Sequence, residues 1–169
     1  NASLVGLPRF DFYANSPIRS PSAIVLFAFL VSDYFVKGVT DELMTQLSRI
    51  TEEFHKNVID FALRNPKYKV VIKTKPAKIY LDQPKDIVKK YYSGTKINNL
   101  TITNNAKVED LIVNSSVVLG YNSTALVEGI TANKTIISPD FSAVLGSNNR
   151  GLFKDYNDLL NYVTAYDGM

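Results

Sequence analysis

The residues best suited to bind a ligand lie in a short polar turn that follows an apolar segment. Gly120 ends the apolar segment, and Ser123 and Thr124 open a stretch with helical spacing. A hydroxyl residue at a helix start leaves backbone N–H groups and the positive end of the helix dipole facing the turn, which favours a phosphate. Glu128 lies on the same helix face as Thr124, where its carboxylate can accept hydrogen bonds from both hydroxyls of a ribose. The alternative is a plain helix cap with a solvated glutamate.

Basic side chains follow another apolar segment. Lys73 and Lys75 come directly after the run at 70–72, so they are expected at the carboxyl end of a strand, where parallel sheets bind ligands. A lysine there can bind a phosphate as a point charge, although a solvated strand end is the alternative. Asp33 and Arg150 are further candidates for ligand contact, because each lies in a loop that follows a predicted strand.

Composition excludes several kinds of site. The 169-residue chain has no cysteine and one histidine, so we expect neither a disulfide framework nor a metal site. That histidine, His55, lies at the edge of an apolar helix stripe and is expected at the surface or its boundary. The net charge of +3 is spread along the chain, without the dense basic stripe typical of nucleic-acid binding. Attraction to phosphorylated molecules or to an anionic membrane surface remains open.

No segment is long and apolar enough to suggest a membrane span. The longest apolar run covers residues 23–31, whereas a membrane-spanning helix needs about 20 residues. We therefore expect the chain not to be a transmembrane protein.

Apolar runs and helical periodicity alternate along the chain, as in a parallel α/β sheet. Strands are predicted at 23–30, 70–72, 100–102, 117–119 and 135–137. Helices are predicted from an N-cap at Thr40 to Asn65, and at 84–92, 109–114, 124–132 and 155–165. Right-handed crossovers would join the strands into a single Rossmann-like doubly wound sheet of order 3-2-1-4-5, with helices on both faces. The switch point of such a sheet lies between the first and fourth strands, where the polar turn begins.

The two ends of the chain have distinct patterns. Within residues 1–22 we expect a tag remnant, Asn1-Ala2, followed by an extended linker, because residues 3–22 are rich in proline, serine and asparagine. Residues 23–169 are expected to form one Rossmann-like nucleotide-binding domain. Its closing helix would turn three apolar side chains inward, namely Leu159, Leu160 and Val163.

Three segments together resemble one enzyme family. The polar turn reads Gly-Tyr-Asn-Ser-Thr over 120–124, with Glu128 after it and then a strand ending at Pro139. Residues 5–11 read Val-Gly-Leu-Pro-Arg-Phe-Asp, and residues 71–76 read Val-Ile-Lys-Thr-Lys-Pro. These segments are similar to the C-terminal, donor-binding domain of GT-B fold glycosyltransferases. Within that group they resemble bacterial enzymes of surface and capsular polysaccharide biosynthesis and CDP-glycerol glycerophosphotransferases.

The resemblance implies a set of donor contacts. The residues assigned to the donor nucleotide are Gly120, Asn122, Ser123, Thr124, Glu128, Lys73 and Pro76. Within this set, Ser123 and Thr124 would meet the donor phosphate and Glu128 the ribose. Lys75 stands where the family has a histidine that contacts the departing phosphate. A lysine supplies charge to that phosphate, but it does not donate a proton near neutral pH unless its pKa falls substantially.

The family also implies what would surround this domain. The substrate would be a sugar or glycerol phosphate linked to CMP, CDP or UDP, with no permanently bound cofactor. The acceptor and the catalytic base would belong to an N-terminal domain outside this chain, so the chain alone would bind nucleotide without transferring sugar. The full enzyme would work in the cytoplasm, including at the inner face of the membrane.

Two alternatives to a transferase stay open. A UDP-sugar 2-epimerase-like domain would need additional acids and a histidine that we cannot place in this sequence. A non-catalytic Rossmann-like relic or interaction module would share the fold and lack the chemistry, and the lysine at position 75 is compatible with it.

Overall fold

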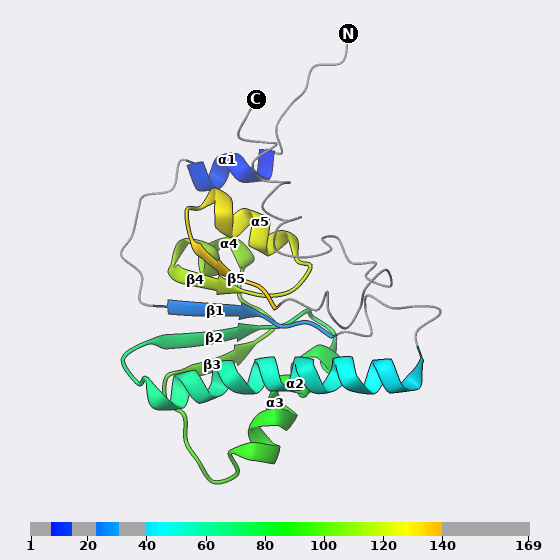
Figure 1. Cartoon of the computed structure of the whole chain (residues 1–169). Helices are drawn as coiled ribbons and strands as arrows, with labels where there is room; N and C mark the ends of the chain where they lie inside the picture. The colour runs from blue at the N-terminus through cyan, green and yellow to red at the C-terminus, as the bar shows by residue number, and fades with distance from the viewer. Residues whose placement is uncertain (1–7, 15–22, 31–39, 140–169) are drawn as a thin grey trace.

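The computed structural model describes residues 8–14, 23–30 and 40–139 (Figure 1). Its five strands form one parallel sheet in the order β3-β2-β1-β4-β5. The strands are β1 (Ala23–Phe27), β2 (Lys69–Lys73), β3 (Leu100–Thr103), β4 (Ser115–Leu119) and β5 (Thr135–Ile137). The helices are α1 (Pro8–Ala14), α2 (Asp41–Arg64), α3 (Lys78–Tyr91), α4 (Val108–Val113) and α5 (Thr124–Thr131). The predicted α/β class and strand order are confirmed.

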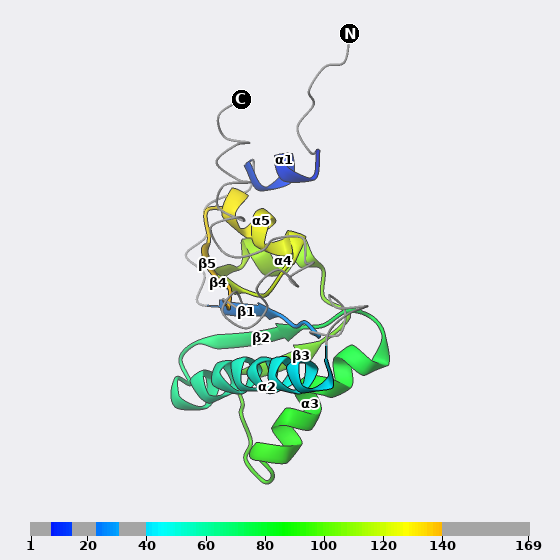
Figure 2. The same ribbon diagram turned by 45° about the vertical axis from the view of Figure 1, so that its right-hand side comes forward.

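Helices cover both faces of the sheet (Figures 1 and 2). α2 and α3 pack on β2 and β3 on one side, whereas α4 and α5 pack on β4 and β5 on the other. Successive side chains of a strand point to opposite faces. Leu26 and Ile72 therefore join the apolar cluster under α2, while Val25, Val71 and Val118 join the cluster under α4 and α5. The central strand is buried on both faces, as its continuous apolar sequence predicts.

α2 begins and ends where the sequence predicts. Thr40 is its N-cap, and the Thr40 hydroxyl oxygen accepts a hydrogen bond from the Leu43 N–H at 3.2 Å. At the other end, Asn65 is the C-cap. The side-chain amide of Asn99 donates to the carbonyl of Ala62 at 2.8 Å. Because Asn99 directly precedes β3, this bond ties the end of the helix to the start of a strand.

Two element boundaries differ from the sequence prediction. α3 begins at Lys78, whereas we predicted a start at Pro84 because proline suits the first turn of a helix. Pro84 lies inside the helix, where it has no N–H to bond the Tyr80 carbonyl. Pro84 is buried in this position, as is Ile87 one turn later. β1 ends at Phe27, three residues earlier than predicted, and the other boundaries agree within two residues.

Part of the predicted N-terminal linker is helical. Residues 8–14 form α1, which packs against α5, so the prediction of an extended segment is wrong for these residues. The first position of α1 is a proline, whose fixed φ suits a helix start. The helix predicted at 155–165 lies outside the residues that the structure describes.

Candidate functional site

The polar turn joins β4 to α5 at the carboxyl end of the sheet. Asn122 has a φ of 47°, a left-handed conformation that asparagine adopts more readily than most residues. Ser123 is the N-cap of α5, and its Oγ accepts a hydrogen bond from the Ala125 N–H at 3.3 Å. Thr124, the first helical residue, is exposed. The predicted helix cap is present, and Thr124 lies at the positive end of the helix dipole in contact with solvent.

Gly120 serves packing in this turn. A Cβ at this position would lie 3.3 Å from the Leu126 Cδ2 and 3.4 Å from the Phe27 carbonyl oxygen. The positive φ of this turn occurs two residues later, at Asn122. Glycine at position 120 therefore lets the end of β4 approach both β1 and α5 closely.

The ends of β2, β1 and β4 lie beside one another at this edge. The Ala28 N–H, just after β1, donates to the Lys73 carbonyl at 2.8 Å. On the other side of β1, Leu26 is in register with Leu119, the residue before Gly120. Because β1 lies between β2 and β4, their ends are two strand spacings apart, about 10 Å. One elongated ligand, such as a nucleoside diphosphate, is long enough to contact both ends.

The predicted basic residues at the end of β2 have different surroundings. The Lys73 Nζ donates to the carbonyls of Thr74 (2.6 Å) and Asn104 (3.0 Å), and burial lowers the pKa of its ammonium. Lys75 is exposed, with its Nζ 4.8 Å from the centre of the Tyr80 ring. Lys73 therefore connects the ends of two strands, whereas Lys75 holds its charge at the surface.

The segment after Lys75 connects the ends of β2 and β3. The Pro76 carbonyl accepts a hydrogen bond from the Asn104 side-chain amide at 3.2 Å. Asn104 thus bonds to both sides of this segment, because its own carbonyl accepts from Lys73. Pro76 is exposed, and its role in the structure is through its backbone.

Glu128 does not face the turn in this structure. Its side chain is 0% exposed, and its Oε2 accepts a hydrogen bond from the hydroxyl of Tyr13 on α1. Thr124 and Glu128 share a helix face as the spacing predicts, but that face is open to solvent at Thr124 and covered by α1 at Glu128. A ribose at the turn reaches the Glu128 carboxylate only if Tyr13 moves away.

Sequence reasoning missed Tyr13 as a partner of Glu128. The two residues are 115 positions apart, so no local spacing connects them. The one available signal is the aromatic run Phe10, Phe12 and Tyr13, which indicates a buried segment in an otherwise polar stretch. Tyr13 and Phe10 do pack in the cluster under α5.

His55 is buried, so its predicted surface position is wrong. The side chain is 0% exposed and lies beside Phe29, with ring centres 5.1 Å apart. Its Nδ1 is 2.8 Å from the Thr51 carbonyl, while Nε2 has no hydrogen-bond partner among the described residues. Burial lowers the His55 pKa to about 4. The ring is therefore neutral at pH 7, and Nδ1 donates to Thr51.

This histidine belongs to an aromatic group directly beneath the polar turn. Phe29 also packs against Tyr121, with ring centres 5.5 Å apart, and Tyr121 lies within the turn and is only 2% exposed. The turn therefore packs on a buried cluster in which the segments after β1 and β4 contact α2.

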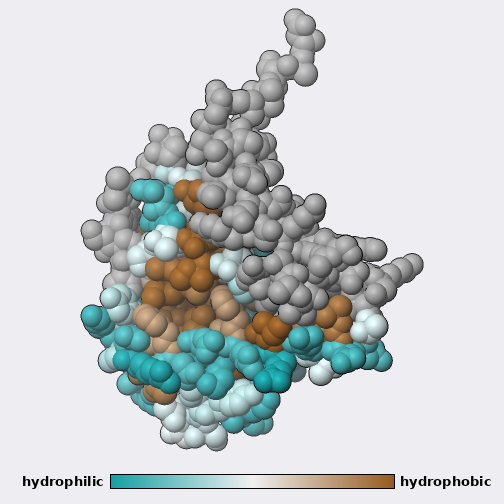
Figure 3. Space-filling view, viewed as in Figure 1, coloured by the Kyte–Doolittle hydropathy of each residue, from teal (hydrophilic) through white to brown (hydrophobic). Residues whose placement is uncertain are grey.

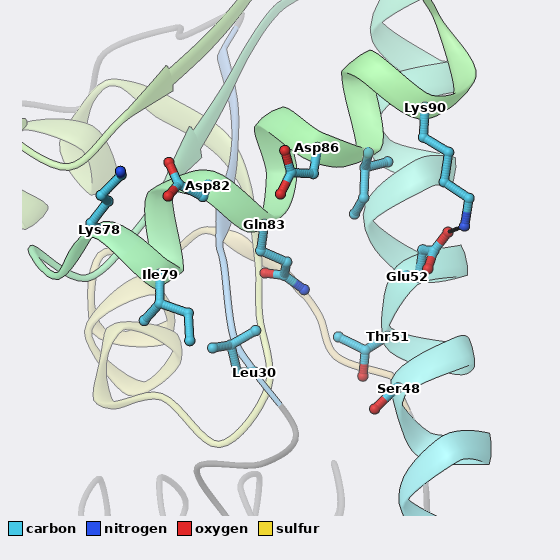
Figure 4. Close-up of a pocket in the computed structure, with 11 residues that line it drawn as sticks. Leu30, Ser48, Thr51, Glu52, Lys78, Ile79, Asp82, Gln83, Asp86 and Lys90 are labelled. Atoms are coloured by element: carbon cyan, nitrogen blue, oxygen red, sulfur yellow. Dashed lines mark hydrogen bonds and ion pairs between the residues drawn. The ribbon is translucent and has the colours of Figure 1, made fainter.

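A hollow between α2 and α3 lies apart from the predicted site (Figure 4). It has a volume of about 700 Å³ and contains none of the residues predicted to bind a donor. Gln83 extends from α3 into the space between the two helices, and the ion pair between Lys90 Nζ and Glu52 Oε1, at 2.6 Å, closes one end. Two carboxylates of α3, Asp82 and Asp86, line the hollow. Lys78 also lines the hollow, so its charged lining is mixed.

Several sequence-based expectations bear on other residues or on the surroundings of the chain. Asp33 and Arg150 lie outside the described residues. Within 8–14, 23–30 and 40–139, no group of three or more metal-ligating side chains could hold an ion. No helix in the described ranges has the length and apolar character of a membrane span.

Comparison with known proteins assigns the chain to no family. No protein-family model matches the chain, and no significant match is found among curated proteins.

Proposed function

We propose that this chain is the donor-binding half of a GT-B-type glycosyltransferase of bacterial surface polysaccharide biosynthesis. The donor would be a CMP-, CDP- or UDP-linked sugar or glycerol phosphate. The position of the polar turn carries the proposal. The turn opens beside β1, and α2 follows β1 onto one face while α5 follows β4 onto the other. Open α/β sheets bind ligands in the crevice at such a switch point.

The donor phosphate would bind at the start of α5. The positive end of the helix dipole there and the exposed hydroxyl of Thr124 are suited to an anion. Lys75, exposed at the end of β2, would add positive charge as the phosphate departs. Lys73 would act indirectly, because its ammonium is bound by two carbonyls and orders the segment that holds Lys75.

Glu128 would join the site when a ribose hydroxyl replaces the Tyr13 hydroxyl as the donor to its carboxylate. The Tyr13 hydroxyl and a ribose hydroxyl are both donors to a carboxylate, so a ribose could replace Tyr13 without leaving the carboxylate unpaired. In the full enzyme, a second domain would supply the acceptor and the catalytic base. Closure of that domain would then exclude water from the reaction.

A non-catalytic module is the second candidate, and the burial of Glu128 favours it. A fully buried carboxylate bonded to a neighbouring helix already has a structural role. In this case the turn would be an ordinary capped loop, and no nucleotide would bind.

Nucleotide titration separates the two candidates. Saturation with CMP, CDP or UDP at about 100 times Kd should stabilise the chain by roughly 2.7 kcal/mol. For a chain of this size, that corresponds to a rise in Tm of about 5–11 °C. We expect one nucleotide to produce this shift and Thr124→Ala to reduce it. Thr131→Ala, at the opposite end of α5, is the matched control and should keep the full shift. No shift with any nucleotide would contradict donor binding.

The role of Glu128 is tested separately by removing the Tyr13 hydroxyl, which would compete with a ribose for the carboxylate. If a ribose replaces Tyr13, Tyr13→Phe should tighten nucleotide binding and Glu128→Gln should weaken it. If Glu128 is only structural, both variants should change the stability of the chain and leave the nucleotide Kd unchanged.

A further inference from the structure

The hollow between α2 and α3 lies where a small ligand can enter (Figure 4). Leu30 lines it just after the end of β1, and Lys78 and Ile79 line it at the start of α3, which follows β2. The hollow is therefore at the carboxyl edge of the sheet, the edge at which open α/β sheets bind ligands. Its volume of about 700 Å³ is within the range of about 300–1,000 Å³ that is typical of small-molecule pockets.

Hydrogen bonds hold the two helices of this hollow together at one end. Glu52 of α2 accepts from the Lys90 Nζ at 2.6 Å and from the Tyr91 hydroxyl at 2.5 Å, and both donors belong to α3. The next residue, Tyr92, donates its hydroxyl to the carboxylate of Asp60 on α2 at 2.5 Å. These bonds fix the spacing of the two helices, so the hollow is preformed, as most small-molecule sites are.

Side chains able to hydrogen-bond a ligand line the hollow from both helices. Figure 4 shows the Gln83 amide of α3 and the Ser48 hydroxyl of α2 directed into the space between the helices. Asp82 and Asp86, one turn apart on α3, add two carboxylates to the lining. Within the part of the chain that the structure describes, none of these four side chains has a hydrogen bond or an ion pair. The hollow thus offers a ligand both donors and acceptors.

The charges of the lining favour a ligand without net charge. Three acids and two lysines line the hollow, a net charge of −1. Of these, Glu52 and Lys90 neutralise each other as an ion pair. The remaining charges have both signs, since Lys78 lies in the same lining as Asp82 and Asp86. The hydroxyl groups of a neutral ligand can donate to the carboxylates and accept from the ammonium, whereas an ion of either sign finds only part of this lining favourable.

Apolar side chains complete the lining, namely Leu30, Ile79 and Ile87, and Ile79 is 65% exposed. A sugar ring combines apolar C–H faces with hydroxyl groups that both donate and accept, so it matches apolar contacts beside hydrogen-bonding groups. We propose that this hollow is a binding site for a neutral saccharide. The site goes beyond the donor-nucleotide site and does not depend on it, because the hollow contains none of the residues assigned to the nucleotide.

Another depression of the described surface provides a comparison within the same molecule. It runs beside α2 over the sheet, where Figure 3 shows brown hydrophobic surface bordered by hydrophilic residues. Apolar side chains such as Phe54, Phe61 and Val117 form most of its lining. Sugar hydroxyls would lose water there without enough partners to replace it, which is unfavourable. A neutral sugar should therefore bind between α2 and α3 and leave this second depression empty.

Titration of the full chain with neutral sugars, followed by the amide signals in NMR spectra, tests the proposal. The probes are glucose, galactose, N-acetylglucosamine and maltose, each added to about 100 mM, which is about 100 times a Kd of roughly 1 mM. We expect at least one probe to produce saturable shifts at Ser48, Thr51 and the side-chain amide of Gln83. The signals of Phe61 and Val117, in the comparison depression, should not move.

Variants on α3 locate the bound sugar. Gln83→Ala should raise the Kd by about three- to tenfold, the factor that one hydrogen bond supplies. Lys85→Ala is the matched control, because Lys85 is exposed on the same helix and does not line the hollow. This control should leave the Kd unchanged. Asp86→Asn keeps an oxygen that accepts from a hydroxyl, so it should weaken binding less than Asp86→Ala does.

Four results would overturn the proposal. One is the absence of saturable shifts with all four neutral sugars, and another is shifts that Gln83→Ala leaves unaltered, which would locate the sugar elsewhere. Binding of glucosamine at least tenfold tighter than that of glucose, abolished by Asp86→Asn, would identify a site for a cation. Tighter binding of glucose 6-phosphate than of glucose would identify a phosphate site. Nucleotide binding is measured separately through Tm, so either proposal can fail while the other holds.

Discussion

Removing the Tyr13 hydroxyl should destabilise the chain, because its hydrogen bond to Glu128 is buried. Tyr13 is 4% exposed and Glu128 is 0% exposed, so water does not replace the missing donor without a rearrangement. A hydrogen bond to a charged group contributes about 1.5–3 kcal/mol to stability. Tyr13→Phe should therefore lower the free energy of unfolding by about that amount, which corresponds to a fall in Tm of roughly 3–12 °C.

An identical chemical change at an exposed site provides the control. Tyr91 donates its hydroxyl to Glu52 at 2.5 Å, but Tyr91 is 43% exposed. Water can replace this hydrogen bond, so Tyr91→Phe should change stability by no more than about 0.5 kcal/mol. Urea unfolding at pH 7 measures both variants. If the two variants lose the same small amount, α1 does not pack on α5 in solution and the reasoning fails.

A double-mutant cycle then isolates the pair. Glu128→Gln keeps an oxygen that can accept from Tyr13, but it removes the charge. The loss caused by Tyr13→Phe should shrink in the Glu128→Gln background, because a neutral hydrogen bond contributes only about 1 kcal/mol. An equal loss in both backgrounds would show that the hydroxyl acts on some other group.

Two further predictions concern α2. Because the pKa of His55 falls from 6.5 to about 4 on folding, the unfolded chain binds more protons in that range, and stability should fall as pH drops from about 6.5 toward 4 and no further below it. At pH 4.5 the free energy of unfolding should be about 2–3 kcal/mol lower than at pH 7. Urea unfolding at both pH values measures this difference. His55→Leu should remove that part of the pH dependence. Thr40→Ala removes the N-cap bond to Leu43 and should cost about 1 kcal/mol, whereas Thr45→Ala, at an exposed position inside the helix, should cost less; equal losses would mean that the cap bond does not form in solution.

The sheet was predictable because each strand has a local signal. Runs such as Val70–Ile72 and Val117–Leu119 are short and apolar and lie between helical patterns, which fixes the α/β class. The order follows from right-handed crossovers and the common doubly wound topology. Strand order therefore needed no information about individual side-chain contacts.

The burial of single polar residues was not predictable in this way. His55 lies at the edge of an apolar stripe, and it packs against Phe29, which comes from the segment after β1. Glu128 is buried because Tyr13 arrives from the other end of the chain. Helical spacing assigns a residue to a face, but it does not say which partner covers that face.

The packing of α1 on α5 also sets an order of events during synthesis. α1 is made before α5, so Tyr13 cannot bond until the ribosome has added the residues up to Glu128, 115 positions later. β1 likewise waits for β4 before its second edge is paired. α1 thus leaves the ribosome well before its partner α5, and until α5 is made the aromatic side chains of α1 are exposed to chaperones and to other nascent chains.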